Sequence, residues 1–128
     1  MDNAEKFSLK WEGKGDEIGD TATFWLELLH DVLGVEKPGN FVEFQKRVSL
    51  DHTSFIDVYI PSTKTIIEQK SYGVNLNKEY QQSDGELLTP YQQAKRYSNN
   101  LPYSEQARWI SESELRSENV QECWIQDC

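Results

Sequence analysis

The stretch FIDVYIPSTKTIIEQK, residues 55–70, joins two segments rich in β-branched and aromatic residues through a short polar segment, and this pattern predicts a β-hairpin. Every second residue from 56 to 60 is Ile or Val, so we expect these three side chains on one face of the first strand and Asp57 on the other. Residues 65–70 predict the second strand, and PSTK, residues 61–64, supplies the turn.

A turn of these four residues fixes which residues face each other across the hairpin. It places Ile60 opposite Thr65 and, by the same register, Asp57 opposite Glu68, with Cβ atoms about 4.5–5.5 Å apart. Lys70 follows Glu68 by two residues and therefore shares its face. The sequence thus predicts that two acids and one lysine meet on the hairpin.

Two carboxylates that face each other repel and destabilise a sheet. A divalent cation such as Mg²⁺ or Mn²⁺ removes that penalty, because hard cations take carboxylate, water and phosphate oxygens as ligands. Lys70 beside the ion could activate a water molecule or neutralise phosphate charge, so the set suits phosphodiester hydrolysis. The alternative is an exposed hairpin with incidental charges, since an acid followed by Glu-x-Lys is common by chance.

The rest of the chain predicts a small mixed α/β domain with the order α-β-β-β-α-β. A first helix is expected over residues 19–34, with Asp20 or Thr21 as its cap, Gly34 at its end and an apolar stripe facing the core. The second helix begins at Thr89, its expected cap, and Pro90, its first residue. Three strands are expected over residues 40–49, 55–61 and 65–70, and a long polar loop over residues 71–89. The second helix is expected over residues 89–100 and a last strand over residues 107–110.

Composition sets the class of protein. The chain has 128 residues, of which 37% are hydrophobic and 27% charged, as in a globular domain without a membrane span or secretory signal. Cys123 and Cys128 are the only cysteines, which predicts a reducing cytoplasm and neither a disulfide framework nor a metal role. The net charge of −9 argues against a nucleic-acid partner. The acidic excess lies in residues 1–40 and 111–128, however, and the charges of residues 41–110 sum to zero. A DNA-binding face there is possible.

Asp57, ten residues and then Glu68-Gln-Lys70 resemble the PD-(D/E)xK motif of nucleases, although Ile56 stands where the motif has proline. Upstream, GDEIGDTATFWLELLHDVLGVEKP, residues 15–38, is similar to the first helix of the N-terminal nuclease domain in type IIG/IIL restriction-modification enzymes, which fuse an endonuclease to an adenine methyltransferase. The resemblance implies that Glu17, which precedes the FW pair of this helix, is a further metal or water ligand.

Gln93 and Tyr97 fit the Q-x-x-x-Y element of RecB-like nucleases and lie four residues apart on one helical face. The resemblance implies that they contact substrate phosphate or brace the active site, and half-buried packing residues are the equally open alternative. The resemblance covers most of the chain and implies a restriction-endonuclease-like core. His30 and His52 are expected to be packing or surface residues.

Two regions are expected on this basis: a nuclease-like domain over residues 1–110 and a divergent or truncated tail over residues 111–128. The tail is set apart because SESELRSEN interrupts the apolar strand that should end the core. A methyltransferase cofactor loop, its Asn/Asp-Pro-Pro-aromatic tetrapeptide and a target-recognition region are not found in this sequence. We expect them in a parent enzyme.

The sequence therefore predicts a Mg²⁺- or Mn²⁺-dependent DNA endonuclease domain of a restriction-modification system. Asp57 and Glu68 are its expected metal ligands, and Lys70 is expected to act on the water. Two alternatives remain open. One is an inactive or truncated fragment of a fused adenine-specific DNA methyltransferase, and the other is a non-catalytic interaction module with the same fold.

Overall fold

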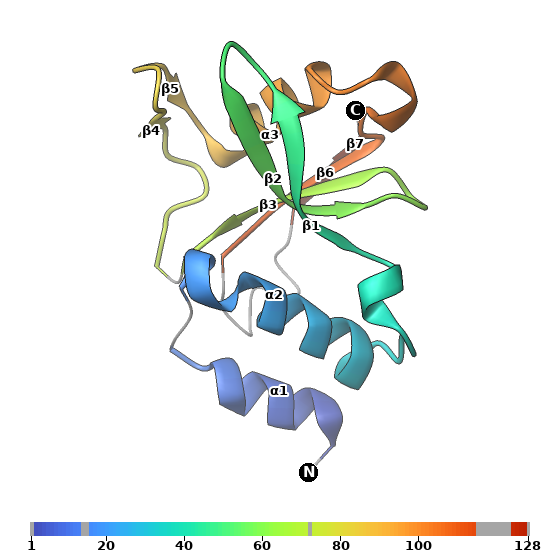
Figure 1. Ribbon diagram of the computed structural model, residues 1–128. Helices are drawn as coiled ribbons and strands as arrows, with labels where there is room; N and C mark the ends of the chain where they lie inside the picture. Colours follow the sequence, from blue (N-terminus) through green and yellow to red (C-terminus); the bar gives the residue numbers. More distant parts are fainter. Residues whose placement is uncertain (1, 14–15, 72, 115–123, 128) are drawn as a thin grey trace.

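A mixed five-stranded sheet forms the centre of the molecule (Figure 1). The computed structural model describes residues 2–13, 16–71, 73–114 and 124–127. The strand order is β1-β2-β3-β6-β7, and only the β3–β6 pair is parallel. The strands are β1 (Glu43–Ser49), β2 (Thr53–Ile60), β3 (Thr65–Lys70), β6 (Trp109–Glu114) and β7 (Trp124–Asp127).

Helices cover both faces of this sheet. The helices α1 (Asn3–Trp11) and α2 (Glu17–Glu27), the latter continued by the π-helical turn η1 (Leu28–Val32), lie on one face (Figure 1). The helix α3 (Pro90–Asn99) lies on the other. The α/β class predicted from the sequence is therefore confirmed, with α1 as an additional helix. Short 3₁₀ turns occur at Pro38–Asn40 and Tyr103–Glu105.

Each face has its own apolar core. The α1/α2 core contains aromatic residues of both helices and the sheet residues Val58 and Ile67. Its rings pack edge to face or tilted, as with Trp11 and Phe24, whose centroids are 5.3 Å apart. The α3 core contains Ile56, Tyr59, Ile66, Ala94, Tyr97 and Ile110. These two layers cover the sheet on both sides of the hairpin.

The predicted turn of the hairpin is confirmed, and the predicted register is confirmed from Ile60 to Val58; the expected ladder pair Asp57–Glu68 is not formed. Residues 61–64 form the turn, and the pairs Ile60–Thr65, Tyr59–Ile66 and Val58–Ile67 follow the expected register. Beyond Val58 the ladder between β2 and β3 stops. The Asp57 carboxylate instead accepts a hydrogen bond from the Gln69 backbone N–H at 2.9 Å, so the acid itself continues the connection between the strands.

The expected alternation along β2 is wrong, because it breaks at Asp57. Ile56 packs in the α3 core and Val58 in the α1/α2 core, although the two residues are only two apart. The β1–β2 ladder lacks the Gln45–Asp57 pair at this level, and Gln45 has a left-handed backbone with φ of 56°. The irregular residue shifts the pleat, so in both strands the side chains on either side of this point face opposite cores.

The first predicted helix is present but begins earlier than expected. Asp20 and Thr21 lie inside α2 rather than at its cap, and the Asp20 carboxylate accepts from the Asp16 N–H at 2.9 Å. Gly34 has φ of +74°, a conformation that favours glycine, and it follows the last turn as predicted. The predicted start of α3 is confirmed, because Thr89 and Gln92 form a capping box and Pro90 is the first helical residue.

The last predicted strand continues further than expected. Residues 109–114, WISESE, form β6 in parallel register with β3, and its residues Ser111, Glu112 and Ser113 are buried. The polar SES segment is thus sheet rather than an interruption, and β6 runs across residue 110, where we expected the domain to end. The rest of SESELRSEN, together with Cys123 and Cys128, lies outside the described residues.

Residues 71–89 are mainly loop, as predicted, with a small hairpin of β4 (Tyr80–Gln81) and β5 (Leu87–Leu88) near its end. Its tight connection uses Gly85, with φ of +88°. Within the described ranges, no helix has both the length and the apolar character that crossing a bilayer requires.

Candidate active site

Asp57 lies on β2 at the break in the strand, facing the side of the sheet that carries α3. Its carboxylate accepts from the Gln69 N–H and interacts with the side chains of Glu68 and Gln45. Burial raises the pKa of Asp57 from its ordinary value, and the Gln69 bond, the Glu68 and Gln45 contacts and the Lys70 charge lower it in part. The site therefore holds this acid in a partly desolvated position.

Glu68 lies on β3 with only 3% of its surface exposed. Burial raises its pKa well above the usual value, the nearby Asp57 charge raises it further, and Lys70 opposes both. Glu68 Oε1 lies 3.3 Å from Lys70 Nζ, whereas Oε2 is buried and has no hydrogen-bond partner within the part of the chain that the structure describes. An unpaired buried carboxylate oxygen is costly, so this atom needs a ligand or a proton.

Lys70 connects the acids to helix α3. Besides its ion pair with Glu68, its ammonium donates to Gln93 Oε1 at 3.1 Å, and Gln93 Nε2 donates to the Tyr97 hydroxyl at 2.9 Å. Burial raises the pKa of Tyr97, so its hydroxyl stays protonated at neutral pH. The structure thus brings together five of the six residues that the sequence singled out: Asp57, Glu68, Lys70, Gln93 and Tyr97.

The donor set fits a hard divalent cation. It offers two adjacent carboxylates, one with a buried oxygen for which the described part of the chain provides no hydrogen-bond partner, beside a lysine held by other side chains. Within the described ranges, no group of three His, Cys, Asp or Glu side chains is arranged to hold a metal. Two carboxylates with the remaining positions left to water and phosphate are a common arrangement for Mg²⁺.

Glu17 is the first residue of α2, and its side chain lies outside what the structure describes, so its role as a further ligand stays a prediction. The helix itself reaches the site indirectly. Trp25 Nε1 donates to Gln69 Oε1 at 2.6 Å, and the Gln69 amide donates to the Ser113 carbonyl at 3.1 Å. Gln69 therefore joins α2, β3 and β6 directly between Glu68 and Lys70.

Sequence reasoning missed three residues around the acids. Gln69 is fully buried, a rare position for an amide, and only its place inside the Glu-x-Lys motif could have drawn attention to it. The Gln45 side chain contacts Asp57, and the Gln45 backbone is left-handed. No sequence pattern predicts this backbone conformation. Ser54, on β2, contacts the Tyr97 hydroxyl.

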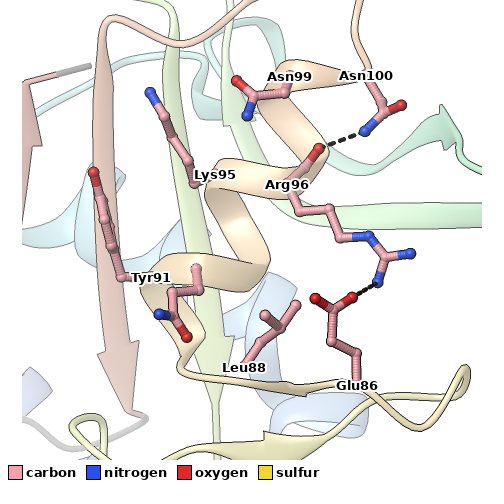
Figure 2. A pocket seen from close by; sticks show the side chains of 8 residues that line it. Glu86, Leu88, Tyr91, Lys95, Arg96, Asn99 and Asn100 are labelled. Atoms are coloured by element: carbon pink, nitrogen blue, oxygen red, sulfur yellow. Dashed lines mark hydrogen bonds and ion pairs between the residues drawn. The ribbon is translucent and has the colours of Figure 1, made fainter.

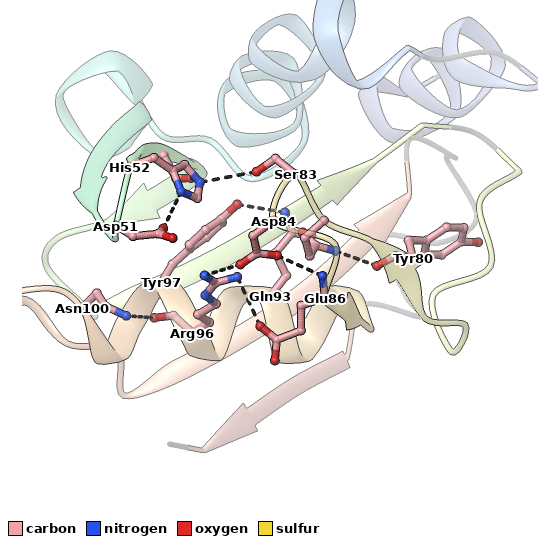
Figure 3. A network of polar contacts seen from close by, with 12 residues as sticks. Asp51, His52, Tyr80, Ser83, Asp84, Glu86, Gln93, Arg96, Tyr97 and Asn100 are labelled. Atoms are coloured by element: carbon pink, nitrogen blue, oxygen red, sulfur yellow. Dashed lines mark hydrogen bonds and ion pairs between the residues drawn. The ribbon is translucent and has the colours of Figure 1, made fainter.

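A polar network borders the site on the outside (Figure 3). His52 is a half-exposed surface residue, as expected, with its Nε2 3.2 Å from Ser54 Oγ and 3.5 Å from Ser83 Oγ. Arg96 of α3 forms ion pairs with Asp84 at 2.7 Å and with Glu86 at 3.6 Å. These contacts fasten the β4–β5 hairpin beside Tyr97 and Gln93.

A separate groove of about 400 Å³ lies on the outer face of α3, between this helix and β5 (Figure 2). Lys95, Arg96 and Asn99 are among its lining residues, whereas the three residues of the acid site are not. The groove and the acid site are therefore different features. His30, the other histidine, is exposed and contacts Asp31 at the surface, as expected.

Comparison with known proteins assigns the family. A family model described as the MmeI N-terminal domain matches residues 2–114, and the chain belongs to this family of restriction-modification enzyme domains. The match includes β6 and all six residues singled out from the sequence. Searches of the curated proteins and of the solved structures found no significant match.

Proposed function

We propose that this chain is a metal-dependent DNA endonuclease domain that hydrolyses phosphodiester bonds within a restriction-modification enzyme. The family supplies the restriction-modification context. The observation that supports the nuclease activity is the buried Glu68 Oε2, which has no hydrogen-bond partner among the residues that the structure describes, in a carboxyl group that lies beside Asp57 and is ion-paired to Lys70.

Asp57 and Glu68 are the residues that hold Mg²⁺ or Mn²⁺ in this proposal. When bound, the ion supplies Lewis-acid polarisation of the scissile phosphate and neutralises its charge. Binding would also relieve the two carboxyl groups, because burial raises the pKa of both and so disfavours their charged forms. Glu17 is a further candidate ligand.

Lys70 acts on the reacting groups. Its ammonium is held by Glu68 and Gln93, which fixes its position next to the acids. There it stabilises negative charge that develops on the phosphate, or in its neutral form accepts a proton from the attacking water. The water oxygen bonds to phosphorus, the bond from phosphorus to the leaving alkoxide breaks, and the alkoxide takes up a proton, which leaves a phosphate monoester and a hydroxyl end.

Gln93 and Tyr97 position Lys70 in this proposal. Gln93 accepts from the Lys70 ammonium, and Tyr97 supports the Gln93 amide from the other side. Because both residues lie on one face of α3, the helix orients them as a unit. Their second predicted role, contact with a substrate phosphate, is compatible with this position and stays a prediction.

The test is cleavage of plasmid DNA by the purified chain with Mg²⁺ or Mn²⁺. Asp57→Asn, Glu68→Gln and Lys70→Met preserve side-chain volume and are expected to abolish cleavage, whereas Glu79→Gln, at an exposed loop acid, is a matched control that should cut like the parent. Mn²⁺ should also raise the thermal midpoint of the parent but not of Glu68→Gln. Equal cleavage by the parent and the Asp57 and Lys70 variants would overturn the proposal.

A further inference from the structure

Gln45 has an unusual backbone at the point where β1 passes Asp57. Its φ of 56° lies in the left-handed region, which is uncommon for a residue other than glycine and more so inside a strand. The pairs Phe44–Val58 and Lys46–Ile56 on either side remain in one common register, while the Gln45–Asp57 pair between them is missing. The distortion is therefore local and adds no residue to either strand.

The distortion changes which face the side chains occupy. Phe44 and Val58 pack towards the α1/α2 core, whereas Val48 and Ile56 are part of the α3 core. A regular strand would return every second residue to the same face, so Ile56 and Val58 would share a core. With the pleat shifted, Ile56 and its neighbour Asp57 both lie on the α3 side.

We propose that Gln45 is a positioning residue of the acid site: its left-handed backbone opens the β1–β2 ladder and allows Asp57 to face Glu68 while Ile56 remains in the α3 core. The catalytic part of this inference rests on the proposed nuclease function. The structural part, the orientation of Asp57, does not.

If Gln45 and Asp57 formed a regular ladder pair, either Ile56 or Asp57 would have to leave the α3 side of the sheet. Ile56 is fully buried, and its departure would remove a large apolar side chain from the α3 core and leave a cavity there. Asp57 is only half-buried and stands beside a second acid, so its departure costs the fold less. Asp57 is therefore the residue expected to turn away, and it would then lose the hydrogen bond from the Gln69 N–H.

Three substitutions at one position separate the backbone from the side chain. Gln45→Gly and Gln45→Asn accept positive φ, and Asn also keeps a side-chain amide. Gln45→Val disfavours positive φ because its side chain is β-branched, and it favours a closed strand. Gln45→Ala carries the same clash in a milder form and replaces Gln45→Val if that variant does not fold.

Lys64 provides the matched control. It is the other residue besides glycine with positive φ in the described part of the chain, at 52° in the β2–β3 turn, so Lys64→Val introduces the same backbone conflict away from Gln45. A general loss of stability would affect both valine variants alike. A specific effect on Asp57 would appear only at Gln45.

The primary measurement is hydrogen exchange of the Gln69 backbone amide by NMR, which needs neither metal nor DNA. Gln45→Val should speed this exchange about tenfold or more, while Gln45→Gly, Gln45→Asn and Lys64→Val stay near the parent. With Mg²⁺ and DNA, Gln45→Val should lower kcat with little change in KM, and Gln45→Asn should restore it.

The two proposals fail in different ways. A parent chain that does not cut DNA refutes the nuclease function, but the exchange measurement still decides the role of Gln45. Unchanged exchange at Gln69 in Gln45→Val, or equally fast exchange in Lys64→Val, overturns the inference.

Discussion

Lys70 Nζ lies 3.3 Å from Glu68 Oε1, while the second oxygen of the same carboxylate is buried without a hydrogen-bond partner among the described residues. Lys70 thus satisfies one oxygen of the buried Glu68 carboxylate. The other neighbouring charged group, the Asp57 carboxylate, has the same sign as Glu68 and repels it. A site with this imbalance is unfavourable to the fold on its own. Under the proposed function, a divalent cation would complete it.

Under the proposed function, replacement of Lys70 should strongly impair DNA cleavage. Lys70→Met keeps most of the aliphatic stem and removes the ammonium, so cleavage should fall by about 10²–10⁴-fold, the range for loss of an acid–base group. Single-turnover cleavage with Mg²⁺ measures this. Lys78→Met, at an exposed loop lysine, is the control, and a loss of similar size in that variant would show that the effect is not specific to Lys70.

The pH dependence of stability follows from the raised pKa values of Asp57 and Glu68. The folded state binds protons at these carboxyls more tightly than the unfolded chain does. Their contribution is therefore fully present below the usual carboxyl range and is lost as pH rises through the raised pKa of Glu68. Without metal, urea unfolding at several pH values should show this decline.

Glu68→Gln should flatten that decline, because it removes the titrating group while preserving its shape. Mg²⁺ should stabilise the parent most at the higher pH values, where both carboxylates are charged, and should have little effect on the variant. A parent whose stability rises over the same pH range would contradict the assignment of buried acids.

The bond between Trp25 and Gln69 should show strong coupling. Trp25→Phe or Gln69→Leu alone leaves a buried polar group without its partner, at a cost of about 1–3 kcal/mol, whereas the double variant removes polar groups from both sides of the bond and should cost less than the sum. Urea unfolding of the four proteins measures the coupling. Additive effects would mean that the 2.6 Å contact contributes nothing specific.

Gln93 and Tyr97 should differ in their effect on cleavage. Gln93→Leu removes the group that holds the Lys70 ammonium, whereas Tyr97→Phe removes only the support behind it. The kcat for DNA cleavage should therefore fall more in Gln93→Leu than in Tyr97→Phe. The reverse order would indicate that Tyr97 contacts the substrate directly.

The cap of α3 should contribute to stability without a role in chemistry. Thr89→Ala breaks the capping box and should cost about 0.5–2 kcal/mol. Ser62→Ala, in the exposed β2–β3 turn, serves as the control and should be nearly neutral. If both variants unfold at the same urea concentration as the parent, the box is not a stabilising contact.

Local signals explain what could be predicted from the sequence. The turn over residues 61–64 and the Thr89 cap depend on neighbouring residues, and both are confirmed. The hairpin register predicted the meeting of Asp57, Glu68 and Lys70, although the β2–β3 ladder itself ends at Val58 and Asp57 lies beside the irregular residue Gln45. The helix residues Gln93 and Tyr97 needed a family resemblance, because their approach to Lys70 depends on how α3 packs on the sheet.

Other features depend on tertiary structure and carry no local signal. Ser111, Glu112 and Ser113 look like a polar interruption, yet they are buried in β6, between β3 and β7. Gln45 is an ordinary polar residue in sequence, and only its backbone angle shows how the strand turns Asp57. Helix α1 was missed although Phe7 and Trp11 are four apart, as expected for one buried helical face.

The parallel pairing of β3 with β6 has a consequence for the order of assembly. Short turns connect the strands of the β1–β2–β3 meander, so the acid pair can form early and with a small loss of chain entropy. Docking of β6 and α3 requires closure of a much longer chain segment and therefore comes later. The two acids should therefore meet before α3 brings Gln93 to Lys70.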